Sequence, residues 1–190
     1  SESGLDALSV RRIAKRIEYS PGTIYLYFRD KDELIAAVVS EGFARLGEYM
    51  REELARASQA ATPTDRLYAV SHAYMQFALE NTAYFRVMFE LPTDACVDCP
   101  QDSDSAMTGE CPWDYVVAAA GAALSEGSLD VASAEEGAVL GWGPLHGLTS
   151  LYLGGHLGSC ARTPDELWAL IQGSLRRMFS QRETLAEERA

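Results

Sequence analysis

Basic, hydroxyl and aromatic side chains are concentrated near the start of the chain, between residues 9 and 31. This stretch holds six basic and two acidic residues, a formal charge of +4, whereas the whole chain carries −12. Dense cationic groups hold phosphates, and small hydroxyl and aromatic side chains contact bases and sugars. The residue types therefore favour nucleic-acid binding by this end alone, with an acidic body that repels DNA. A basic helix face that is merely solvated is the alternative.

Two short helices joined by a tight turn are expected to position these side chains. Ser9 can cap the first helix. Ser20 and Pro21 start the second, since proline at the first helical position loses no hydrogen bond. Ile24 and Phe28, four residues apart, then pack inward. Such a helix-turn-helix places its second helix in the major groove of DNA.

The spacing of these residues resembles the DNA-binding domain of the tetracycline-repressor (TetR) family. The shared positions are Ser9, Ile13, Ala14, Ser20, Gly22, Thr23, Ile24, Tyr25, Tyr27, Phe28, Lys31 and Leu34. The resemblance implies a bacterial transcriptional regulator, a repressor that binds a pseudo-palindromic operator as a homodimer. A small-molecule effector is then expected to release it from double-stranded DNA.

Residues of this head that the resemblance assigns to DNA contact are Ser9, Arg11, Ser20, Pro21, Gly22, Thr23, Tyr25, Leu26 and Lys31. Thr23 and Tyr25 are expected to face bases and backbone, and Gly22 to permit close approach. Ser9, Arg11 and Lys31 are expected to hold phosphates. Leu26 replaces a frequent histidine and can touch only a thymine methyl or a sugar.

The resemblance also has gaps. Glu18 and Tyr19 stand where the family has a turn glycine and a valine, so a slightly different turn is expected. The family carries a first helix before the motif, and residues 1–7 look like the linker that follows it. We therefore expect a head that is truncated at its N-terminus.

The remaining chain has helical periodicity, so an all-α fold is predicted. We expect the helix-turn-helix domain over residues 1–34, running into a connecting helix to about residue 58, and a ligand-binding and dimerisation domain over residues 59–190. Further helices are predicted over residues 62–81, 84–89, 113–124, 133–154 and 163–179. Residues 92–112 break the pattern and predict an irregular loop.

Aromatic residues of the second domain could line a ligand cavity between helices. A weaker resemblance, carried by residues 74–78, 84–89, Trp142, His146 and Gly147, is to a TetR-family C-terminal domain type named for its Trp-His-Gly residues. The cavity candidates are Tyr74, Phe77, Met88, Trp113, Trp142 and His146. Core packing is the alternative for each, and the effector itself is not identified.

Glycine pairs at residues 137/141 and 143/147 predict a close helix–helix contact. The resemblance implies that the last two long helices pair with their two-fold mates as a four-helix interface. The expected interface residues are Gly141, Leu145, Leu148, Trp168, Ile171 and Leu175. The alternative is that both helices are buried within their own monomer. Pro144 is expected to kink its helix.

Cys96, Cys99 and Cys111 have ligand types that zinc uses, with His156 and Cys160 elsewhere. A metal- or thiol-responsive sensor, with the head vestigial or used for protein contacts, is therefore the alternative function. Unliganded loop thiols are the simpler explanation. No cofactor is predicted, and no phosphate loop, HExxH or G-x-S-x-G motif indicates an enzyme. Apolar runs are too short for a membrane span, so a cytoplasmic location is expected.

Overall fold

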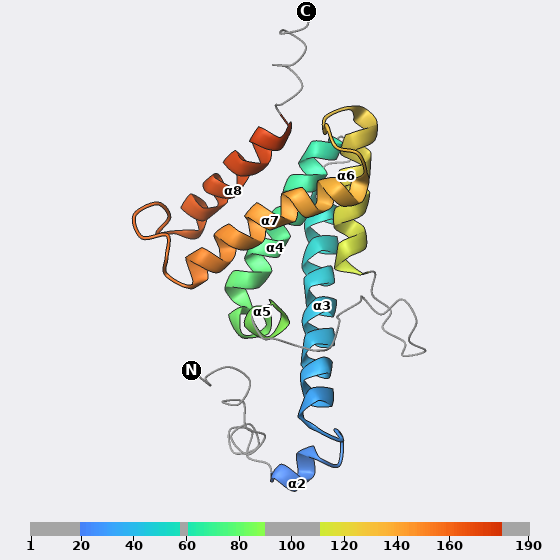
Figure 1. Ribbon diagram of the computed structural model, residues 1–190, viewed down its shortest axis with the longest axis vertical. Helices are drawn as coiled ribbons and strands as arrows, with labels where there is room; N and C mark the ends of the chain where they lie inside the picture. Colours follow the sequence, from blue (N-terminus) through green and yellow to red (C-terminus); the bar gives the residue numbers. More distant parts are fainter. Residues whose placement is uncertain (1–19, 58–60, 90–110, 180–190) are drawn as a thin grey trace, which may run out of the picture.

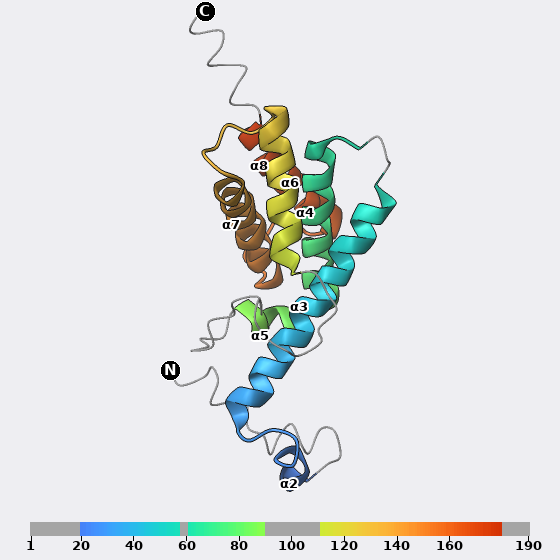
Figure 2. The same cartoon turned by 90° about the vertical axis from the view of Figure 1, so that its right-hand side faces the viewer.

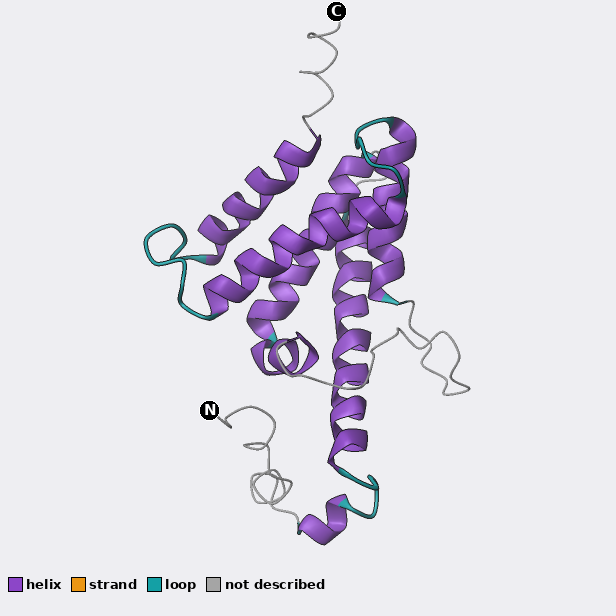
Figure 3. Ribbon diagram, viewed as in Figure 1, coloured by secondary structure: helices purple, strands orange, loops and turns teal. Residues whose placement is uncertain are grey.

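The structure is a computed structural model that describes residues 20–57, 61–89 and 111–179. Every regular element in these ranges is an α-helix, which confirms the all-α prediction (Figure 3). The helices are α2 (Pro21–Ile24), α3 (Lys31–Arg56), α4 (Pro63–Glu80), α5 (Thr82–Phe89), α6 (Pro112–Glu126), α7 (Ala134–Leu153) and α8 (Pro164–Phe179). Their bounds agree with the predicted ones to within about two residues, the usual uncertainty of a helix end. The predicted loop falls almost wholly outside the described residues.

Helix α3 is the long axis of the molecule, with α2 at one end and the bundle of α4, α6, α7 and α8 toward the other (Figures 1 and 2). Helix α4 is central, because it contacts α3, α5, α6, α7 and α8. One large apolar core fills the bundle, and a small separate one joins buried Ile24 to Phe28 and Leu34 in the head. The two cores are connected through α3, so the position of the head depends on this helix.

Side-chain caps fix where the long helices begin. Asp30 accepts a hydrogen bond from the Glu33 backbone N–H at 2.8 Å. The Glu33 carboxylate in turn accepts a hydrogen bond from the backbone N–H of Arg29, at 2.6 Å. This backbone hydrogen bond is the main cause that lowers the pKa of Glu33. At α4 the capping box between Thr62 and Asp65 is complete. Both α3, which links the head to the bundle, and α4 therefore begin at defined residues.

Helices α3 and α5 come into close contact at Gly42. A Cβ added at this buried glycine would overlap the Met88 sulfur and lie 3.0 Å from Met88 Cγ and 3.3 Å from the Tyr84 ring. Beside it, the Arg45 guanidinium lies 5.1 Å from the centre of the Tyr84 ring, a cation–π contact. Because glycine is unfavourable inside a helix, its presence here is explained by this approach.

We predict that Gly42→Val destabilises the protein by about 1–3 kcal/mol, because the added side chain forces α5 away from α3. Urea denaturation followed by circular dichroism measures this free energy of unfolding. The matched control is Gly173→Ala in α8, where the nearest atom to an added Cβ is 3.9 Å away. This control should gain up to about 1 kcal/mol from its higher helix propensity. Equal effects of the two variants would contradict the close contact.

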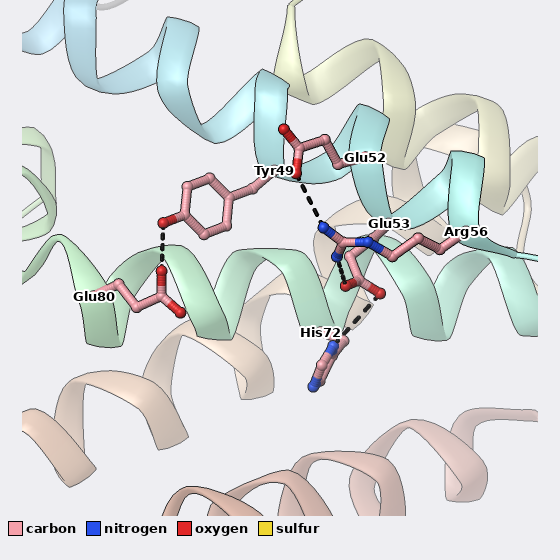
Figure 4. Close-up of polar contacts among 6 residues, drawn as sticks. All are labelled: Tyr49, Glu52, Glu53, Arg56, His72 and Glu80. Atoms are coloured by element: carbon pink, nitrogen blue, oxygen red, sulfur yellow. Dashed lines mark hydrogen bonds and ion pairs between the residues drawn. The ribbon is translucent and has the colours of Figure 1, made fainter.

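Polar contacts also hold α3 against α4 (Figure 4). The Tyr49 hydroxyl donates to the Glu80 carboxylate at 2.6 Å, and this bond is the main cause that raises the pKa of Tyr49. The same hydroxyl accepts from the Asn81 side chain at 3.1 Å. One turn further, Glu53 lies 3.7 Å from the His72 ring nitrogen. These contacts link α3, which leads to the head, directly to α4 and to Asn81 at its C-terminal end.

Candidate functional site

Hydrogen bonds of Ser20 define the start of α2, the second helix of the predicted helix-turn-helix. The Ser20 hydroxyl accepts a hydrogen bond from the Thr23 backbone N–H at 3.1 Å and lies 2.8 Å from the Thr23 hydroxyl. Helix α2 ends at Ile24, and the backbone N–H groups of Tyr27 and Phe28 both donate to the Ile24 carbonyl. Buried Ile24 anchors this turn, so the preceding and following side chains face outward.

Three consecutive side chains form an apolar tip at this end of the molecule: Tyr25, Leu26 and Tyr27, which are 52%, 81% and 77% exposed. Large apolar groups exposed together favour a contact surface. Tyr25 and Leu26 were predicted as DNA contacts, whereas Tyr27 was missed as a site residue. Its match to the motif spacing was the signal that could have included it.

Of the other predicted head residues, the exposure of four is described by the structure and that of three is not. Ser20 and Gly22 are exposed, and Thr23 and Lys31 are half-buried beside the apolar tip. Among the described residues, an added Cβ at Gly22 would meet the Ser20 hydroxyl, at 3.7 Å, which is an ordinary van der Waals distance. Ser9, Arg11 and the Pro21 side chain lie outside what the structure describes, and their roles stay predictions.

A cavity of about 30 Å³ lies between α3, α4, α6, α7 and α8. Of the predicted ligand-binding residues, Tyr74 and Trp142 line it. Phe77 and Met88 are buried in the apolar core, and Trp113 packs edge-on against Trp142 with ring centres 6.4 Å apart. The structure therefore brings two candidates to the cavity wall and places three elsewhere.

His146 lies behind this wall. Its Nδ1 is 2.7 Å from the Tyr74 hydroxyl, and its Nε2 is 3.4 Å from that of Ser150. The imidazole ring stacks on Phe85 at 5.4 Å and contacts Phe89 at 5.3 Å. Burial is the main cause that raises the pKa of Tyr74, so the phenol is neutral and can donate to His146. His146 orients the hydroxyl of a cavity residue.

Sequence reasoning missed most of the cavity wall, including Met50, Val70 and Ser71. Met50 belongs to α3, the helix that leads to the head. Helical periodicity marks all three as inward-facing, but it does not distinguish a cavity wall from a packed core. Met50 matters most, because it places the connecting helix in direct contact with any molecule inside the cavity.

The predicted dimer residues also divide. Leu145, Ile171 and Leu175 are buried within the chain's own core, as the alternative for these helices expected. Trp168 is half-buried against His72, with ring centres 4.8 Å apart. Gly141 and Leu148 are half-buried too. A partner subunit could therefore meet only part of the predicted set.

An apolar face of α7 and α8 remains exposed. On α7 this face consists of Leu140, Pro144, Gly147 and Leu151, which we call the α7 stripe. In it, Leu140 is 47% exposed and Leu151 is 44% exposed. Leu170 on α8 is also exposed, at 36%. An added Cβ at Gly147 would meet nothing within 4 Å, so the close contact predicted for this glycine is not made within the described part of the chain. Gly137 does pack closely, because an added Cβ there would lie 3.3 Å from the Leu129 side chain.

The cysteines give no metal site within the described ranges. Cys111, at the N-cap of α6, is disulfide-bonded, and Cys160 is an exposed thiol. Cys96 and Cys99 lie outside these ranges. In the ranges 20–57, 61–89 and 111–179, no group of three His, Cys, Asp or Glu side chains could hold a metal ion. None of the helices in these ranges has the length and apolarity needed to cross a bilayer.

Comparison with protein families places both parts of the chain. Residues 67–175 match the tetracyclin repressor-like C-terminal domain, and residues 1–38 match the bacterial regulatory proteins of the TetR family. The chain belongs to the TetR family of transcriptional regulators. This confirms the family that the head residues predicted.

Individual TetR relatives resemble the chain in part. The HTH-type transcriptional regulator BetI of Yersinia pestis (strain Pestoides F) is 35% identical over 44% of this chain, and the fatty acid metabolism regulator protein of Bacillus subtilis (strain 168) is 31% identical over 37%. The matched segments span 41% and 34% of these relatives. A protein of unknown function from Rhodococcus sp. RHA1 shares the fold, with a TM-score of 0.66 at 23% identity, covering 94% of this chain and 89% of that one.

Proposed function

We propose that the chain is a dimeric repressor that binds a pseudo-palindromic operator and is released by a small-molecule effector. The observation that carries this proposal is the apolar tip, held out beside Thr23 and Lys31 at the end of α3. Aromatic and apolar side chains at this position can contact sugars and thymine methyls in the major groove, while Lys31 and Arg11 hold phosphates.

The exposed α7 stripe with Leu170 supports the dimer. The side chains on this face of α7 are apolar, so covering them with a partner removes apolar surface from water. Gly147 has no side chain, which allows a partner helix to approach closely. Helices that pair about a two-fold axis present the same patch twice. Two heads held in this way can meet successive major grooves, about 34–36 Å apart.

Coupling between the cavity and the head has two structural routes. The direct one is Met50, which belongs to α3 and lines the cavity. The second passes through α5, because Phe89 lies 6.0 Å from Trp142 and 5.8 Å from Phe43 of α3 between ring centres. An effector that displaces Met50 or Trp142 therefore moves α3 and with it the head. It can shift the equilibrium between the DNA-binding and the released spacing of the two heads only by as much as its affinities for these two states differ.

We predict a steep salt dependence for operator binding. An operator is first selected from random duplex DNA, and its dissociation constant is then measured by fluorescence anisotropy from low to high salt. Two cations per head, Arg11 and Lys31, neutralise four phosphates in the dimer, so the slope of log K against log salt should be at least about 3.6 in magnitude. Failure to enrich any sequence, or a flat salt dependence, would contradict the proposal.

A further inference from the structure

The cavity between the bundle helices has an uncharged wall. Among the residues that the structure describes, its lining is apolar apart from Ser71, Tyr74 and Trp142, and none of these lining residues is Asp, Glu, Lys or Arg. The Ser71 hydroxyl already donates to the Leu67 carbonyl at 2.7 Å, and the Tyr74 hydroxyl is bonded to His146. Because both hydroxyls already have a hydrogen-bond partner, water gains little by entering, and apolar cavities of this kind stay dry and accept apolar guests.

A charged occupant is disfavoured in such a place. Moving an ion from water into an apolar site is costly unless an opposite charge and hydrogen bonds receive it. Within the described part of the chain, Tyr74 is the one titratable side chain of the wall, and burial keeps it neutral. His146, behind Tyr74, is surrounded by the rings of Phe85, Phe89 and Trp142. None of the described wall residues is a Lys or Arg that could pair with an anion, so a carboxylate probe tests the uncharged class directly.

One hydrogen-bonding group can still be received. The Tyr74 hydroxyl can use its proton in the contact with His146, and its oxygen has two lone pairs. A hydroxyl on the occupant can donate to one of them.

The size of the cavity requires that its wall opens. A volume of about 30 Å³ holds roughly two water molecules, so a larger guest must displace side chains. Met50 and Trp142 can respond, because a methionine side chain has several rotatable bonds and Trp142 is 36% exposed at the surface. These are the residues on the two routes to α3.

We propose that the effector is an uncharged, mostly apolar molecule that enters this cavity and places a single hydrogen-bonding group on the Tyr74 hydroxyl. The inference rests on the proposed function, because it names the ligand class of that regulator.

Four probes with one carbon skeleton test the proposal: 3-phenylpropan-1-ol, 3-phenylpropanoate, 3-phenylpropylammonium and propylbenzene. Calorimetry on the full chain, without DNA, gives each affinity. The alcohol is expected to bind at least 10-fold more tightly than either ion. Tyr74→Phe should weaken the alcohol about 5- to 10-fold, since one hydrogen bond is lost, and leave propylbenzene unchanged. Tyr68→Phe, on the same helix and outside the cavity wall, should change neither.

Equal or tighter binding of the carboxylate or the ammonium would overturn the uncharged class. Absence of binding by all four probes would overturn the inference as well. Equal losses for the alcohol and propylbenzene in Tyr74→Phe would show that Tyr74 acts by packing and does not receive the hydroxyl. Operator binding by the chain without probes is measured separately. Its loss would overturn the proposed function, whereas intact operator binding with no probe bound would overturn this inference alone.

Discussion

Replacing Tyr25 and Lys31 together by alanine is expected to weaken operator binding by about 1,000-fold. Tyr25 is 52% exposed in the apolar tip and is proposed to contact bases and backbone, and half-buried Lys31 is proposed to hold a phosphate. A dimer loses four contacts, and each is worth about 1 kcal/mol or more. Fluorescence anisotropy with the selected operator at one fixed salt concentration measures the change.

The control for this double variant is Arg51→Ala. It removes an exposed cation from α3 near the bundle, away from the head, and should leave affinity within about twofold. Thermal melts of both variants should match that of the parent protein, since Tyr25 and Arg51 are exposed and Lys31 is only half-buried. An unchanged operator affinity in the double variant would refute DNA binding by this head and favour its use in protein contacts.

Local signals in the sequence were sufficient to predict the helices. Thr62 with Asp65 and Ser133 with Glu136 mark the starts of α4 and α7, and the structure contains both side-chain caps. Such signals depend on a few neighbouring residues, so they can be recognised in the sequence alone. The carboxylates of Glu33 and Glu136 are equally local, because each accepts from the backbone N–H one residue before the N-cap, that of Arg29 and that of Ala132.

The use of each apolar side chain could not be predicted in the same way. Helix α7 is apolar on most of its faces, so periodicity does not separate the face that meets its own chain from the one left for a partner. Leu145 was assigned to the dimer and is core, whereas Leu140 is exposed. Phe77 and Met50 show the same problem at the cavity, because a wall and a core differ only by small gaps in three-dimensional packing.

Substitutions in the α7 stripe are expected to have a large effect on dimer formation. Leu140→Glu combined with Leu151→Glu is expected to convert the dimer to a monomer, raising the dimer dissociation constant more than about 1,000-fold. Both leucines are exposed in the single chain, at 47% and 44%, so the monomer should keep its fold. In a dimer four leucines would be lost from the interface, at about 1.5–3 kcal/mol for each fully buried side chain, and four carboxylates would be forced together. Sedimentation equilibrium measures the dissociation constant.

Operator affinity should fall together with the dimer, because two heads on separate monomers lose the high effective concentration that one dimer gives them. The matched control adds the same charges elsewhere, with Ala83→Glu on α5 and Ala118→Glu on α6, both exposed positions. This control should remain dimeric and bind the operator normally. If the stripe variant stayed dimeric, the two-fold contact would have to lie on another face. If it became monomeric and still bound the operator with full affinity, one head would suffice for recognition, and the pseudo-palindromic operator would have no structural basis.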